Sequence, residues 1–153
     1  MIIAFGCDHA GYSYKERIFE FLHSLGHKVI DCGCFSDISC DYPDFAKPVA
    51  VYVSRKICEY GILVCGSGIG MSIAANKFSG IRAALCFTQE IAALSKDHNN
   101  ANILCLPARF CSVEEAVNWI KIWLETKFAD NPRHRRRINK IGKIEKKYSR
   151  KVR

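Results

Sequence analysis

The sequence predicts an α/β fold in which a five-stranded parallel sheet is covered by helices on both sides. Five short apolar segments alternate with segments whose apolar residues recur every three or four positions. Strands that alternate with helices in this way form parallel sheets, and parallel sheets are buried on both faces. The length of 153 residues suits one domain, and the apolar share of 49% is that of an ordinary globular protein.

The expected strands are short apolar runs: Ile2–Phe5, Lys28–Cys32, Gly61–Cys65, Ile81–Phe87 and Asn102–Leu106. The first helix is expected to begin at Tyr14 and to end at Gly26. Pro43 suits the first turn of a second helix, whereas Pro48 predicts either a kink or a later start. Further helices are expected over 69–77, over 89–97 and after Ser112, which forms a capping box with Glu115.

Charge divides the chain into a domain over residues 1–132 and a basic extension over residues 133–153. The extension holds eleven Lys and Arg against one acid, whereas the domain has a formal charge of −2. Arg133 and Arg137 are four residues apart, so in a helix they would share one face. Beyond Lys140 we expect a solvated or disordered end.

Composition also bears on location and on metals. No apolar run approaches the roughly 20 residues of a membrane-spanning helix. Residues 1–6 lack the basic leader of a signal peptide. We therefore expect a cytoplasmic protein that does not bind a membrane. The nine cysteines are an odd number without a secretory signal, which favours free thiols in a reducing compartment. Cys32, Cys34 and Cys40 could be metal ligands, but no second Cys or His pair completes a tetrahedral site, and we expect no metal.

The most informative segment is the glycine-rich run from Cys65 to Met71, which follows the third strand. Alternating glycines allow backbone amides to converge on an anion, either a phosphate or a developing oxyanion. The same surroundings would favour the thiolate form of Cys65, as a base or a nucleophile. A tight turn with a buried cysteine would explain the same residues. The dinucleotide-binding pattern does not fit, because Met71 stands where a glycine is required.

Two histidine segments are further candidates. Asp8 and His9 end the first strand at the same edge of the sheet, where they could orient a hydroxyl and bind a phosphate. Asp8 could equally cap the helix that follows. His98 lies at the end of a helix just before the fifth strand, where a histidine commonly interacts with the helix dipole.

Taken together, these segments resemble the ribose-5-phosphate isomerase B family. The following recur there in this order: 6–11, 41–43, 65–70, 74–77, 80–83, 98–99 and the pattern Arg133-His134-x-x-Arg137. The resemblance covers about residues 2–145. It implies a three-layer Rossmann-like domain and a homodimer, or a tetramer, with active sites at the subunit interface. It implies no metal and no cofactor.

The resemblance also implies a reaction and roles for individual residues. The reaction is the interconversion of D-ribose 5-phosphate and D-ribulose 5-phosphate through an enediolate, a step of the pentose phosphate pathway. Cys65 would carry the proton between C2 and C1, and His98 would open the sugar ring. The enediolate oxygens would be held by the loop of Gly66, Ser67, Gly68, Ile69 and Gly70. The sugar would be contacted by Asp8, Tyr42 and Asn99, and the phosphate by His9, Arg109, Arg133 and Arg137.

Two departures from the family leave alternatives open. Met71 occupies the position at which one branch of the family has a glutamate base, so the chain resembles the cysteine branch. The basic extension exceeds what one phosphate requires. An isomerase of a six-carbon sugar 6-phosphate, allose or galactose, shares these loops and is the nearest alternative. A nucleic-acid-binding protein would explain the basic extension, but the domain lacks an aromatic RNA-binding signature, so we expect no nucleic acid. By fold alone, a flavodoxin-like mononucleotide-binding module is a further alternative.

Overall fold

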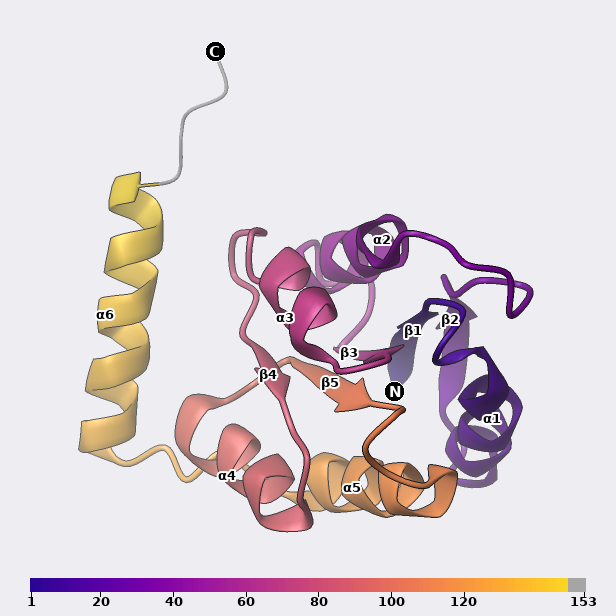
Figure 1. Cartoon of the computed structure of the whole chain (residues 1–153). Coiled ribbons are helices and arrows are strands. Elements are labelled where there is room, and N and C mark those ends of the chain that lie inside the picture. Colours follow the sequence, from indigo (N-terminus) through magenta and orange to yellow (C-terminus); the bar gives the residue numbers. More distant parts are fainter. Residues whose placement is uncertain (149–153) are drawn as a thin grey trace.

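The computed structural model describes residues 1–148 and confirms the predicted α/β fold: a parallel sheet lies between two layers of helices (Figure 1). The sheet has the order β2-β1-β3-β5-β4, and every pairing is parallel. The strands are β1 (Ile2–Cys7), β2 (Lys28–Asp31), β3 (Tyr60–Cys65), β4 (Ala83–Leu85) and β5 (Ile103–Pro107). The helices are α1 (Lys15–Ser24), α2 (Tyr42–Ser54), α3 (Ile69–Ala75), α4 (Gln89–Asn99), α5 (Val113–Glu125) and α6 (Pro132–Tyr148), with a short 3-10 helix, η1, over Tyr12–Tyr14.

Successive side chains of the central strands point to opposite faces of the sheet and build two cores. On one face, Phe5, Ile62 and Leu104 pack with residues of α1, α4 and α5, including the fully buried Trp123. On the other face, residues such as Leu63 pack against α2 and α3. Burying each large apolar side chain contributes about 1.5–3 kcal/mol, so the near-continuous apolar strands hold both helical layers.

The outer strand β4 is shorter than the predicted run of 81–87. Its first expected residues are diverted into a loop, because the backbone N–H of Arg82 donates to Asn102 Oδ1 at 2.8 Å rather than to a neighbouring strand. By contrast, β1 extends past Phe5 to Cys7. Its Gly6 permits this, since a β-carbon there would lie 2.7 Å from the carbonyl oxygen of Phe45 in α2.

Helix α2 begins at Tyr42, so the expectation of a later start is wrong. Pro43 lies in the first turn, where a missing N–H is tolerated, and Asp41 precedes it in an extended conformation. Pro48 lies inside the same helix, which therefore forgoes the hydrogen bond that residue 48 would donate to Asp44. The buried residues Val49 and Val53 secure the helix against the sheet on either side of this gap in its hydrogen bonding.

Helix α6 stands beside the domain, past the β4 edge of the sheet (Figure 1). It is held there by buried His134 near its start and by Glu145, whose Oε1 accepts from the Gly80 N–H at 2.7 Å. The helix continues beyond Lys140 to Tyr148, so the expected disorder is wrong for this part, while Lys143, Lys146 and Lys147 are exposed as expected. The charges expected at 150, 151 and 153 lie outside the described residues. Within residues 1–148, no helix has the length and apolar character needed to span a membrane.

Candidate active site

A cavity of about 380 Å³ opens where β1 and β3 end, at the sheet edge that commonly binds ligands in parallel α/β folds. Eight of the residues predicted from the sequence line it: Asp8, His9, Tyr42, Cys65, Gly66, Ser67, Gly70 and Arg109. Phe110 also lines the cavity and was not predicted, because an isolated exposed aromatic residue in a loop carries no pattern.

Cys65 is the last residue of β3, and its side chain is almost fully buried at the wall of the cavity. The backbone N–H of Gly68 donates to its sulfur at 3.2 Å. Burial of the thiol explains part of its position, as expected for a structural cysteine, but the sulfur also faces a backbone donor in a cavity lined by ionisable groups. A cysteine that only fills space needs neither of these features.

The glycines of the loop are required by close contacts. Gly68 has φ of 72°, a left-handed conformation that favours glycine, and it precedes α3. A β-carbon at Gly70 would lie 2.5 Å from Tyr42 Cζ, so the tyrosine ring packs directly against the loop. A β-carbon at Gly66 would lie 3.2 Å from Arg109 Nε, which places the arginine side chain over the start of the loop. Ser67 Oγ accepts from the Ile69 N–H at 3.3 Å, which leaves its hydroxyl hydrogen free to be donated.

Asp8 and His9 are oriented by backbone groups. Asp8 is buried, and its Oδ1 accepts from the N–H groups of Ala10 and Gly11 at 2.9 and 3.2 Å. It therefore stabilises the loop ahead of η1 and lines the cavity as well. The alternative interpretation, that Asp8 caps the following helix, is wrong, because neither η1 nor α1 has a side-chain cap. The Nδ1 atom of His9 accepts from the Cys40 N–H at 3.2 Å. In the neutral ring, Nε2 then carries the proton and can donate it to a ligand.

The remaining predicted residues lie elsewhere. His98 and Asn99 end α4, four or five residues before β5 begins at Ile103. Cys65 pairs with Pro107 at the other end of β5. Since each strand residue advances about 3.3 Å, the length of the strand, roughly 13 Å, separates the two edges. Within one copy of the chain, His98 and Asn99 therefore do not reach the cavity that contains Cys65.

Arg133 and Arg137 are both exposed on α6, near the end of α4 rather than near the cavity. His134, between them, is 2% exposed, and its ring lies 4.3 Å from that of His98, centroid to centroid. The sequence assigns no role to His134, although it lies within the pattern of Arg133 and Arg137. Four neighbouring arginines predict that this segment is exposed to solvent, so a buried histidine is not expected there.

Lys96 is a second buried group that the sequence did not reveal. It is 3% exposed, its Nζ lies 3.3 Å from the centre of the Tyr60 ring, and it donates to the Ala101 carbonyl at 3.3 Å. Burial, with a smaller contribution from Arg82, lowers the pKa of Lys96 to about 7. All nine cysteines are free thiols. Among residues 1–148, no three His, Cys, Asp or Glu side chains are grouped so that they could hold a metal ion.

Comparison with known proteins identifies the family. The family described as Ribose/Galactose Isomerase matches residues 3–141. The chain is 42% identical to ribose-5-phosphate isomerase B of Escherichia coli over 145 residues, which cover 95% of this chain and 97% of that protein. Ribose-5-phosphate isomerase B of Clostridium thermocellum has a solved structure that superposes with a TM-score of 0.93 at 47% identity, covering 97% of this chain and 99% of that one.

A third comparison concerns a bound sugar phosphate. The enzyme of Mycoplasma genitalium, solved with bound ribulose-5-phosphate, superposes with a TM-score of 0.90 at 41% identity and covers 95% of this chain and 96% of that one. The matches in sequence and structure span nearly the whole chain, and the cavity is lined by residues of three of the segments that suggested the resemblance, 6–11, 41–43 and 65–70. This chain belongs to the ribose/galactose isomerase family.

Proposed function

We propose that this chain interconverts D-ribose 5-phosphate and D-ribulose 5-phosphate through an enediolate, with Cys65 as the base. The observation that carries the proposal is the position of Cys65, in one cavity with a glycine-rich loop and with His9 and Arg109. A base, donors for an oxyanion and cations for a phosphate are the groups that aldose–ketose isomerisation of a sugar phosphate requires.

In the central step, the Cys65 thiolate removes the proton from C2 of the open-chain aldose, and negative charge develops on the oxygens of C1 and C2 in the resulting enediolate. The Cys65 thiol then returns the proton to C1, while the hydroxyl proton of the C2 oxygen moves to the C1 oxygen, which leaves the ketose. The Gly68 N–H donates to the sulfur, and Gly66, Ser67 and Gly70 line the same cavity, so backbone amides of the loop and the Ser67 hydroxyl supply the donors that such an enediolate needs. Asp8 and Tyr42, which line the same cavity, contact the remaining sugar hydroxyls.

The phosphate is bound at the part of the cavity that His9 and Arg109 line. His9 presents its Nε2–H, and Arg109 presents a guanidinium group that suits the phosphate oxygens. Arg133 and Arg137 would complete this set, although both lie on α6 of the same copy and away from the cavity. No metal is needed for this scheme, since the donors and cations named here take up the charge.

We further propose that the chain acts as a homodimer in which a second copy completes each site. His98, Asn99, Arg133 and Arg137 gather around the end of α4, whereas Cys65 lies at the other edge of the sheet. Opening of the ring by His98 therefore requires a second copy to bring that cluster to the cavity. Helix α6 supports this arrangement, because it stands off the domain with Ile141, Ile144 and Tyr148 exposed at helical spacing (Figure 1).

The substrate is tested by assaying the purified protein on ribose 5-phosphate, allose 6-phosphate and galactose 6-phosphate under the same conditions. We expect kcat/KM to be at least about tenfold higher for the five-carbon substrate, since the relatives from Escherichia coli and Clostridium thermocellum are named ribose-5-phosphate isomerase B. A preference for a six-carbon substrate would reassign the chain within its family. Turnover of none of the three would refute the isomerase proposal.

A further inference from the structure

The end of α4 is held by two side chains that the reaction scheme does not use. The last carbonyl groups of a helix accept no hydrogen bond from N–H groups of the same helix, so they need donors from elsewhere. At α4 these carbonyls belong to the residues proposed to open the ring and to bind the sugar, His98 and Asn99, and to Asn100, which has a left-handed conformation. Whatever holds these carbonyls also sets the direction of the His98 and Asn99 side chains.

The first of the two side chains is Arg82. Its Nε lies 3.1 Å from the Asn99 carbonyl oxygen and 3.0 Å from that of Asn100, and its Nη2 donates to Asn100 at 2.8 Å. The side chain is half-buried, and burial lowers the pKa of Arg82, opposed by the carboxylate of Glu145. The guanidinium group is thus partly removed from water, which costs free energy, and the hydrogen bonds to the two carbonyl groups offset this cost.

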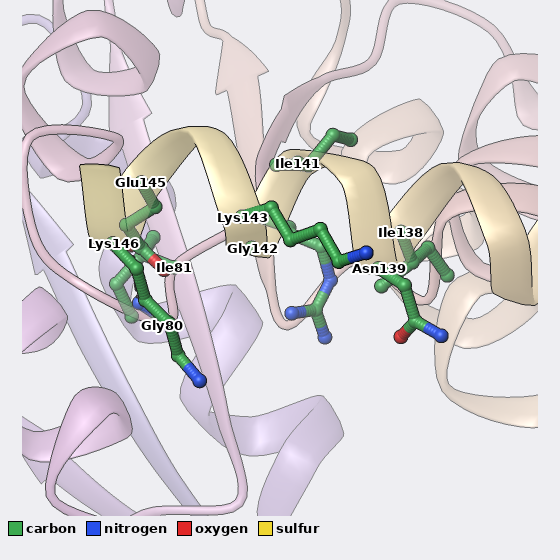
Figure 2. A pocket seen from close by; sticks show the side chains of 10 residues that line it. Gly80, Ile81, Ile138, Asn139, Ile141, Gly142, Lys143, Glu145 and Lys146 are labelled. Carbon is green, nitrogen blue, oxygen red and sulfur yellow. Dashed lines mark hydrogen bonds between the residues drawn. The ribbon is translucent and has the colours of Figure 1, made fainter. Parts of the chain in front are cut away.

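The backbone of Arg82 is fixed in turn. Asn102 accepts from the Arg82 N–H and donates to the Gly80 carbonyl, both at 2.8 Å. On the other side, Gly80 donates to Glu145 of α6, and Figure 2 shows Gly80 and Ile81 lying beside Glu145 and Lys146 at that end of the helix. The loop over 80–82 therefore links β5, α4 and α6 in one hydrogen-bonded unit.

The second side chain is His134. Its Nδ1 lies 3.0 Å from the His98 carbonyl oxygen, so Nδ1 must carry the proton and donate it. In the neutral ring, Nε2 then accepts from Arg133 Nη2, which lies 3.3 Å away. The buried His134 ring thereby joins the backbone of His98 to a guanidinium group proposed to bind phosphate.

We propose that Arg82 and His134 are positioning residues that clamp the end of α4 and so fix His98 and Asn99 for ring opening. This inference rests on the proposed function of His98. The clamp touches neither the sugar nor Cys65 of the same copy. It acts through the backbone of α4, and His134 also ties that backbone to Arg133, so that the ring-opening group and one phosphate ligand move as a unit.

The test compares two reactions of each variant. One is turnover of cyclic ribose 5-phosphate, which requires ring opening. The other is exchange of solvent deuterium into C1 of ribulose 5-phosphate, which has no furanose form because its 5-position is blocked. Arg82→Met should lower aldose turnover by about tenfold to a hundredfold, as misplacement of a catalytic group by about 1 Å does, and should largely spare the exchange. Arg82→Lys should recover part of the loss, while Arg55→Met, at an exposed arginine, should leave both reactions unchanged.

A matched pair tests the other side of the clamp. His134→Asn can retain a donor at the Nδ1 position, whereas His134→Gln moves the amide to the Nε2 position, so the glutamine variant should show the larger imbalance between the two reactions. The proposal would be overturned if Arg82→Met and His134→Gln left the ratio of aldose turnover to deuterium exchange at its wild-type value. Equal loss of both reactions would give that result and would indicate a merely structural role. If Arg82→Met does not fold, the His134 pair decides. A wild-type protein without turnover of any sugar phosphate would instead refute the proposed function.

Discussion

Replacing Cys65 by alanine should abolish most of the activity without unfolding the protein. General-base catalysis contributes about a hundredfold to ten-thousandfold, so the barrier should rise by about 3–5 kcal/mol. The cost in stability is smaller. One sulfur atom at the wall of an open cavity and one hydrogen bond from Gly68 are lost, which together cost about 1 kcal/mol. A domain with roughly 5–15 kcal/mol of stability remains folded after that loss.

The assay is kcat for ribose 5-phosphate, measured together with the free energy of unfolding in urea. Cys65→Ser is the matched substitution, because its hydroxyl keeps an acceptor for the Gly68 N–H but is a much weaker acid than a thiol. Cys105→Ala is the control: this thiol is fully buried in the adjacent strand, and burial raises its pKa well above the usual value, so it stays protonated. Cys105→Ala should lose stability and retain turnover. Near-normal turnover in folded Cys65→Ala would refute the assignment of the base.

His98→Asn should slow turnover of cyclic ribose 5-phosphate by at least about a hundredfold and largely spare deuterium exchange into ribulose 5-phosphate; equal losses would refute ring opening by His98. Arg137→Ala should raise KM by about tenfold, or roughly 1.4 kcal/mol, while Arg136→Ala, also exposed on α6, should not; equal effects would refute a specific phosphate contact. Burial lowers the pKa of Lys96 to about 7, so the folded protein binds fewer protons than the unfolded chain from there up to the ordinary lysine pKa. The free energy of unfolding in urea is measured for wild type and for Lys96→Met, and the difference in favour of wild type should rise by up to about 1.4 kcal/mol per pH unit between pH 7 and 10. A difference that stays constant over this range would mean that Lys96 keeps an ordinary pKa.

The order of strands and helices was predictable because local periodicity decides it. The apolar runs before Cys65 and Ala108 are buried on both faces of the sheet, and such runs stand out in a sequence. Boundaries were less predictable, since long-range contacts set them. The start of β4 depends on Asn102, twenty residues away, and the uninterrupted α2 depends on packing that outweighs the hydrogen bond lost at Pro48.

The candidate site likewise has a part that the sequence predicts and a part that it does not. The groups that follow β1 and β3 could be placed at one edge from topology alone, and they line one cavity. His98 could not be assigned to that cavity, because it precedes a strand rather than following one and lies at the other edge. Neither His134 nor Lys96 could be found by pattern. Both stand among charged residues in the sequence, and only the packing of α4 against its neighbours buries them.

The central claim, an isomerase whose sites combine residues of two copies, is tested most directly by mixing two inactive variants. Cys65→Ala and His98→Asn are each purified, then unfolded together and refolded so that mixed dimers form. A mixed dimer would contain one intact site, made of Cys65 from one copy and His98 from the other, and one site lacking both. With random pairing in a two-fold dimer, the mixture should regain up to about one quarter of wild-type activity on ribose 5-phosphate. No recovery, in a mixture shown to contain mixed dimers, would contradict the claim.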